Sequence, residues 1–154
     1  MGGQACILYG GAEFSRDTDL VLLGDEANLG RLRTALDELQ AETIAVPPFE
    51  KRYLDEGLAV HFRCRHPDAP GMRVDVMTRL PGLPDFHKLW EARVTMDLDG
   101  EPVDVLCLPD LIRAKKTQRD KDWSMIRRLM EANYFLQGTA PSPQHIPFSV
   151  VPIS

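Results

Sequence analysis

The sequence predicts an α+β domain with a mixed β-sheet flanked by helices and a helical C-terminal part. Strands are indicated at 58–64 and 72–78, where apolar and polar residues alternate. Helices are indicated at 26–39 and again after residue 120, where apolar residues recur every three or four positions. Because the two kinds of segment follow one another along the chain, we expect them to pack around a shared core.

The composition is that of one soluble folded domain. The chain has 154 residues, 44% apolar and 27% charged, which favours a packed core over disorder. Its 18 basic and 23 acidic residues give a net charge of −5, so a purely electrostatic nucleic-acid binder is not expected. Neither a membrane-spanning apolar run nor a signal-peptide pattern is present. Three cysteines in apolar runs indicate free buried thiols in a reducing cytoplasm: Cys6, Cys64 and Cys107.

The N-terminal third is expected to contain a helix, a strand and a second helix. A short helix over 4–9 is closed by Gly10-Gly11, and a strand follows at 18–23. Asp25 is a suitable N-cap for the helix over 26–39, whose apolar face carries Leu29, Leu32, Leu36 and Leu39.

The middle of the chain is expected to supply the inner strands. A short helix over 49–55, ended by Gly57, precedes the two alternating strands. In the second strand, alternate residues share a face, so two groups of three point apart: Met72, Val74 and Val76, and Arg73, Asp75 and Met77. A short helix over 85–93 follows, and Trp90 is expected to lie in the core.

A hairpin and two helices are expected after residue 93. Strands at 94–98 and 103–106 flank Asp99-Gly100, a favoured hairpin turn that Glu101-Pro102 makes slightly longer than the tightest kind. Pro109-Asp110 then opens a helix.

The last helix is expected to begin at Asp120 or Asp122. Its predicted apolar face consists of Trp123, Ile126, Leu129 and Met130. We therefore expect one domain over 1–138 and a Pro-rich, extended tail over 139–154.

Three aspartates are the strongest candidates for chemistry. Asp17 and Asp19 are two residues apart at the head of a predicted strand, so both carboxylates lie on one face. Asp75 interrupts an apolar strand, where a buried unpaired charge is costly. It is therefore expected to pair with Arg73 or Arg79, to lie on an exposed sheet face, or to join the other two aspartates around a hard divalent cation.

Other residues near these acids are suited to phosphate. Gly2-Gly3 precede a short helix, where backbone N–H groups can approach a phosphate closely. Ser15-Arg16 directly precedes the acidic pair, and Arg16 either contacts phosphate or neutralises the neighbouring carboxylates. A basic run forms either a solvated helical face or a cationic wall for a triphosphate or an RNA backbone: Arg113, Lys115, Lys116, Arg119, Lys121, Arg127 and Arg128.

A zinc site is a competing interpretation of His61, Cys64 and His66. On a strand, however, His61 and Cys64 face apart, and no fourth ligand follows at a zinc-like spacing. We therefore favour a site built from the aspartates.

Together these motifs resemble the DNA polymerase β-like nucleotidyltransferase superfamily. Its members have a Gly-Gly or Gly-Ser pair, a short helix, an Asp-x-Asp and a third acid on a later strand. The matching segments here are GGQACILYG, FSRDTDLVLL, MRVDVMTRL and VDVLCLPDLIRAKKTQRDKDW. The likeness covers about residues 2–130 and is closest to small bacterial nucleotidyltransferases of the AbiEii toxin type, found in type IV toxin–antitoxin and abortive-infection systems.

The resemblance implies a polymerase β-like fold and assigns residues by position. Asp17, Asp19 and Asp75 match the catalytic acids, which would hold two Mg²⁺ ions. The residues then expected around the phosphates of an NTP are Gly2, Gly3, Ser15, Arg16 and Lys115. Family members have a strand ahead of the glycine pair, whereas Met1 stands there in this chain, so either the start is truncated or misassigned, or this member lacks that strand and its sheet has one strand fewer.

The implied reaction moves a nucleoside monophosphate from an NTP to an acceptor hydroxyl and releases pyrophosphate. The acceptor would be a tRNA, a protein or a small molecule, and a toxin-like enzyme would have an antitoxin or regulator as partner. No membrane partner is expected. The alternative is a catalytically impaired binding or regulatory module that keeps the same fold.

Overall fold

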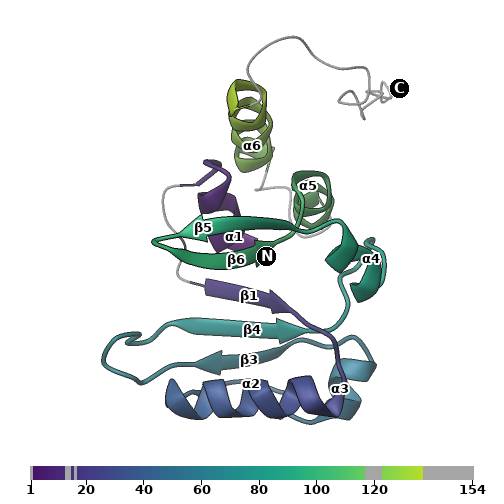
Figure 1. Cartoon of the computed structure of the whole chain (residues 1–154). Helices are drawn as coiled ribbons and strands as arrows, with labels where there is room; N and C mark the ends of the chain where they lie inside the picture. The colour runs from purple at the N-terminus through teal and green to yellow at the C-terminus, as the bar shows by residue number, and fades with distance from the viewer. Residues whose placement is uncertain (1, 13–14, 16, 117–122, 137–154) are drawn as a thin grey trace.

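The computed structural model describes residues 2–12, 15, 17–116 and 123–136 (Figure 1). It is an α+β structure, as predicted. Its helices are α1 (Gly2–Leu8), α2 (Glu26–Glu38), α3 (Lys51–Asp55), α4 (Phe86–Glu91), α5 (Leu108–Lys116) and α6 (Trp123–Leu136). Its strands are β1 (Asp17–Val21), β2 (Glu42–Thr43), β3 (Val60–Arg63), β4 (Arg73–Met77), β5 (Val94–Leu98) and β6 (Glu101–Val105).

The main sheet is mixed, which confirms that part of the prediction. Its four strands lie in the order β1-β4-β3-β2, with β1 parallel to β4 and the other two pairs antiparallel. Strand β2 was not predicted, because its two exposed residues, Glu42 and Thr43, carry no alternating pattern. Strands β5 and β6 form a separate antiparallel hairpin.

Two apolar clusters pack against the sheet from opposite sides. Helices α2 and α3 cover the side to which Val60, Phe62, Val74 and Val76 point. Helices α1, α5 and α6 belong to the other cluster, and Figure 1 shows α2 on the far side of the sheet from them. The alternation predicted for β4 therefore separates an apolar face from the face that carries Asp75.

The predicted helix ends at Asp25 and Gly10 are confirmed. The carboxylate of Asp25 accepts a hydrogen bond from the N–H of Asn28 at 2.6 Å, which caps α2. Helix α1 ends at Leu8, and Gly10 just beyond it has a φ of 77°, a left-handed conformation that glycine adopts without strain.

The hairpin turn is tighter than predicted. Leu98 pairs with Glu101, so only Asp99 and Gly100 form the loop, both with positive φ as a two-residue hairpin requires. Pro102 lies inside β6 rather than in the loop. A two-stranded sheet tolerates this proline because each strand has an edge at which a missing N–H breaks no ladder bond.

Two side chains expected in the core are exposed. Trp90 is 45% exposed because α4 packs inward through Leu89, and Met130 is 47% exposed because Ile126 and Leu129 take the buried side of α6. Leu58 lies outside β3 and is also exposed. The side chain of Trp123 and the predicted helix starts at Asp120 and Asp122 lie outside the described residues, as does the tail over 139–154.

The cysteines are reduced, and two of them are buried as predicted. Cys6 and Cys64 are buried in the two clusters, whereas Cys107 is partly exposed. Among the described helices, none combines the length and apolar character that crossing a membrane requires.

We predict that Leu29→Ala lowers the free energy of unfolding by about 2–5 kcal/mol, because Leu29 is fully buried on the side of α2 that packs against the sheet. Urea denaturation measures this loss. The control Asp37→Ala, on the exposed side of the same helix, should change stability by no more than about 0.5 kcal/mol. Equal losses in both variants would contradict the packing described for α2.

Candidate acidic site

The parallel pairing of β1 with β4 brings two of the three predicted acids together. Asp19 lies directly opposite Asp75, and Asp17 lies opposite Arg73. Because paired residues on neighbouring strands point to the same side, the three carboxylates share one face of the sheet. We call Asp17, Asp19, Arg73 and Asp75 the acidic face.

Asp75 is buried and held by two basic side chains. Its Oδ1 accepts a hydrogen bond from Nε of Arg73 at 2.7 Å and lies 2.8 Å from Nδ1 of His61. The residue is only 8% exposed, so these partners offset the cost of burying its charge. Of the salt bridges considered from the sequence, the one to Arg73 forms, and Arg79 makes no ion pair with Asp75 in the described part of the chain.

The short contact to Asp75 fixes the tautomer of His61. An ionised carboxylate only accepts hydrogen bonds, so Nδ1 of His61 must carry the proton that it donates to Asp75. The 3.2 Å approach of Arg73 Nη2 to the same nitrogen is then a contact between two donors rather than a second hydrogen bond.

The surroundings of Asp19 disfavour the ionised form of its carboxyl group. Burial raises its pKa most, and the neighbouring charge of Asp75 raises it further. The charge of Lys115 and a hydrogen bond from the Gly3 backbone N–H lower the pKa of Asp19 but do not cancel the rise. Burial and the charge of Asp75 together therefore favour the protonated form of Asp19.

The glycine pair packs directly against the acidic face. A Cβ on Gly2 would overlap the carboxylate of Asp19, and one on Gly3 would overlap the hydroxyl of Ser15. That hydroxyl donates to the carbonyl of Asp17 at 2.9 Å, which ties the segment before β1 to its first residue. The pair is thus required for close packing around Asp19.

Of the predicted basic residues, Lys115 reaches the acidic face. It lies on α5, half-buried, and its charge acts on Asp19. Arg113 pairs with Asp110 and Arg127 pairs with Glu131, so these two behave as ordinary helix-surface residues. The predicted residues Arg16, Arg119 and Lys121 lie outside the described residues.

The donor chemistry of the acidic face suits a hard divalent cation, since carboxylate oxygens are its preferred ligands and Asp19 and Asp75 face each other. Within the residues described, however, no three His, Cys, Asp or Glu side chains are grouped as metal ligands. The guanidinium of Arg73 instead supplies positive charge there. Its hydrogen bond to Asp75 and the charges of all three aspartates raise the pKa of Arg73 and so stabilise its charged form.

The arrangement of His61 and Cys64 does not support the zinc interpretation. Cys64 is buried in the apolar cluster beneath α2, while His61 contacts Asp75 on the opposite face of the sheet. The two side chains therefore point apart, as strand alternation requires.

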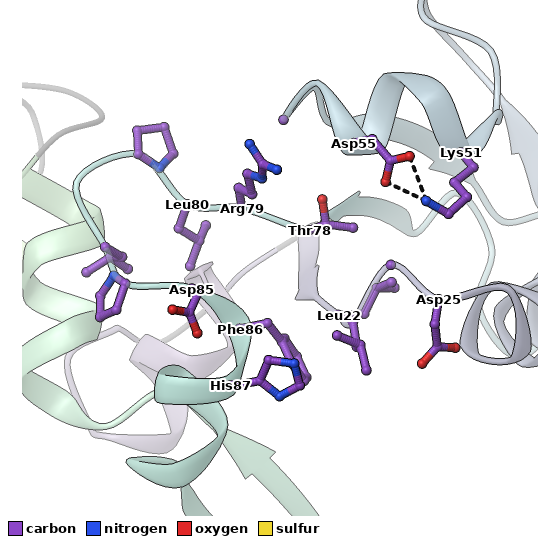
Figure 2. Close-up of a pocket in the computed structure, with 16 residues that line it drawn as sticks. Leu22, Asp25, Lys51, Asp55, Thr78, Arg79, Leu80, Asp85, Phe86 and His87 are labelled. Carbon is purple, nitrogen blue, oxygen red and sulfur yellow. Dashed lines mark hydrogen bonds and ion pairs between the residues drawn. The ribbon is translucent and has the colours of Figure 1, made fainter.

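A separate cleft of about 810 Å³ lies at the carboxyl ends of β1 and β4 (Figure 2). None of the acidic-face residues lines it; Leu22, Thr78, Arg79 and Phe86 do. Since Thr78 follows Asp75 by three residues, the cleft begins roughly 10 Å further along the strand. Its acids already have partners within the protein, as the salt bridge between Lys51 and Asp55 in Figure 2 illustrates.

Sequence reasoning missed His61 as a partner of Asp75, and it missed the cleft. The two residues lie at matching positions of neighbouring predicted strands, but their contact depends on a register that single-strand patterns do not specify. The cleft is formed by loops and helix ends with no shared motif.

Comparisons of the chain with protein-family models, with curated proteins and with solved structures find no match.

We predict that Gly2→Ala destabilises the fold by about 1–3 kcal/mol more than Gly71→Ala, as measured by urea denaturation. Both glycines have a positive φ, 73° and 72°, so the backbone cost is the same in both variants. Only at Gly2 would the added methyl group meet the Asp19 carboxylate, whereas the space around Gly71 is open. Equal losses would show that Gly2 does not pack closely on Asp19.

We predict that Asp19→Asn raises the melting temperature at pH 7 in metal-free buffer. A carboxyl group with a raised folded-state pKa stabilises the fold below its unfolded pKa of about 3.8, and this contribution is lost as the pH rises through the folded value. Asparagine mimics the protonated form, so the gain should disappear in acid. The control Asp37→Asn, on the exposed side of α2, should show no such pH-dependent gain.

Proposed function

We propose that this protein is a Mg²⁺-dependent nucleotidyltransferase of the polymerase β-like fold. It would transfer a nucleoside monophosphate from an NTP to an acceptor hydroxyl on a tRNA, a protein or a small molecule, as a toxin-like enzyme would. The observation that carries the proposal is the register of β1 and β4, which sets Asp19 opposite Asp75 with Asp17 on the same face.

Three further features support the proposal. The glycine pair packs against Asp19, Lys115 acts on the same carboxylate, and the pKa of Asp19 is raised. A bound cation would relieve the repulsion between Asp19 and Asp75. These features come from separate parts of the chain and meet at one place, as expected for a site rather than for incidental surface charge.

In this proposal each residue has a role that follows from its position in the site. Asp17, Asp19 and Asp75 would hold two Mg²⁺ ions, which supply charge neutralisation for the triphosphate and acidify the acceptor hydroxyl. Gly2, Gly3, Ser15 and Lys115 would orient the phosphates. The acceptor oxygen forms a bond to the α-phosphorus, the bond from that phosphorus to the bridging oxygen breaks, and pyrophosphate leaves; Asp75 would assist removal of the hydroxyl proton.

A non-catalytic binding or regulatory module is the second candidate, and one observation favours it. Arg73 and His61 already hold Asp75, so the charge of the third acid is offset within the protein. A module of this kind would bind nucleotide weakly or not at all and would act through a protein partner such as an antitoxin or regulator.

We predict that the purified protein releases pyrophosphate from at least one Mg²⁺–NTP when it is given a mixture of tRNA, protein and small-molecule acceptors. Each NTP is supplied with an α-phosphate label, and the labelled acceptor class is identified. Asp17→Asn, Asp19→Asn and Asp75→Asn should each reduce labelling by about a hundredfold or more, because each removes a carboxylate that would hold the Mg²⁺ ions, whose charge stabilises the transition state.

The matched control is Asp37→Asn, an exposed aspartate on α2 away from the acidic face, which should keep full activity. Wild-type labelling by the Asp19 or Asp17 variant would refute the mechanism. Failure of the wild-type protein to label any acceptor, together with failure to bind any NTP, would favour the non-catalytic module.

A further inference from the structure

The acidic face already contains a positive charge, the guanidinium of Arg73. Its Nε donates to Asp75 at 2.7 Å, and its backbone lies opposite Asp17 in the ladder. The charges of Asp17 and Asp19 also act on it. The guanidinium is therefore bonded to one carboxylate and acts by its charge on the other two, in the place where the proposed function requires metal ions.

The Arg73 side chain is also partly open to solvent. The Arg73 side chain is 39% exposed, against 12% for Asp75, so Arg73 can turn into solvent while Asp75 stays fixed in the sheet. His61 remains bonded to Asp75 after such a movement, because it approaches from β3 on the other side.

We propose that Arg73 is an exchangeable counter-ion that holds free divalent cations off the acidic face and moves from Asp75 to the phosphates of an incoming metal–triphosphate complex. This rests on the proposed function, since it concerns how the same site is loaded. Free metal meets a positive charge at Asp75. A metal–triphosphate complex brings phosphate oxygens, which the planar guanidinium binds as well as it binds a carboxylate.

Exchange of this kind couples metal binding to nucleotide binding. The metal displaces Arg73 from Asp75, and the triphosphate gives Arg73 a new partner, so each ligand favours the other. The site would then take up metal with substrate rather than before it.

The chain offers a matched control for general charge effects. Arg63 lies directly opposite Arg73 in the β3–β4 ladder and therefore on the same face of the sheet. It is exposed, and in the described part of the chain no hydrogen bond or ion pair joins it to the acidic face. Arg63→Gln and Arg73→Gln thus remove the same charge from neighbouring positions.

The test measures binding of Mn²⁺, a spectroscopic substitute for Mg²⁺, to the full chain by electron paramagnetic resonance. Free Mn²⁺ and a preformed Mn²⁺–tripolyphosphate complex are titrated separately. Arg73→Gln should bind free Mn²⁺ about tenfold more tightly and the complex about tenfold more weakly than wild type, since one charge-assisted hydrogen bond is lost in each case. Arg73→Lys should show smaller shifts in the same directions, and Arg63→Gln should leave both affinities within about twofold.

Opposite shifts for the two ligands are required, because loss of a merely structural ion pair would weaken both or neither. Unchanged Mn²⁺ affinity in Arg73→Gln, or an equal gain in Arg63→Gln, would overturn the exchange. If Arg73→Gln does not fold, as judged by circular dichroism, the Arg73→Lys shifts decide the matter. The Asp19→Asn variant separates the two levels of inference: Mn²⁺ binding that is lost in this variant but insensitive to Arg73 refutes only the exchange. Mn²⁺ binding that does not depend on Asp19 refutes the proposed function as well.

Discussion

The parallel pairing of β1 with β4 is the constraint on which the acidic face depends. Neighbouring strands lie about 4.8 Å apart, so a register that sets Asp19 opposite Asp75 forces two carboxylates together on a partly buried surface. The same register aligns the apolar residues of β4 with α2 on the other side of the sheet. A slip of one residue would turn Asp75 into the apolar cluster and Val74 out of it, so the packing that stabilises the fold also fixes the position of the acids.

Basic side chains from several elements offset the repulsion between these carboxylates. Arg73 comes from the same strand as Asp75, His61 comes from the next strand, and Lys115 comes from a helix near the end of the described chain. The result is unequal: two basic side chains contact Asp75 directly, while the pKa of Asp19 stays raised despite the Gly3 hydrogen bond and the charge of Lys115. Such an imbalance lowers stability, and proteins retain a destabilising arrangement of this kind most often where it serves a function.

Much of the fold could be predicted from local patterns, because those patterns are themselves the cause of the structure. The leucine spacing of α2, its cap at Asp25 and the alternation of β4 were each predicted and are confirmed. The errors arose where tertiary packing decides. Trp90 and Met130 are apolar and were expected in the core, yet Leu89 and Leu129 take the buried positions beside them. The Asp-x-Asp of β1 and the lone Asp75 were visible as candidates, but their meeting, and the part played by His61, required a strand register that no single segment contains.

The acidic face and the cleft at the carboxyl ends of β1 and β4 differ in how their charged groups are partnered. In the cleft at the carboxyl ends of β1 and β4, Asp55 is paired with Lys51 and the carboxylates of Asp25 and Asp85 cap helices. The hydroxyl of Thr78 is likewise bonded, to the carbonyl of Leu54. On the acidic face, by contrast, the charge of the partly exposed Arg73 guanidinium acts on all three carboxylates, and burial and the charge of Asp75 raise the pKa of Asp19. Carboxylate oxygens that an incoming cation can engage are what a site for a hard divalent cation requires, and for this reason the cation site that we propose lies on the acidic face rather than in the cleft.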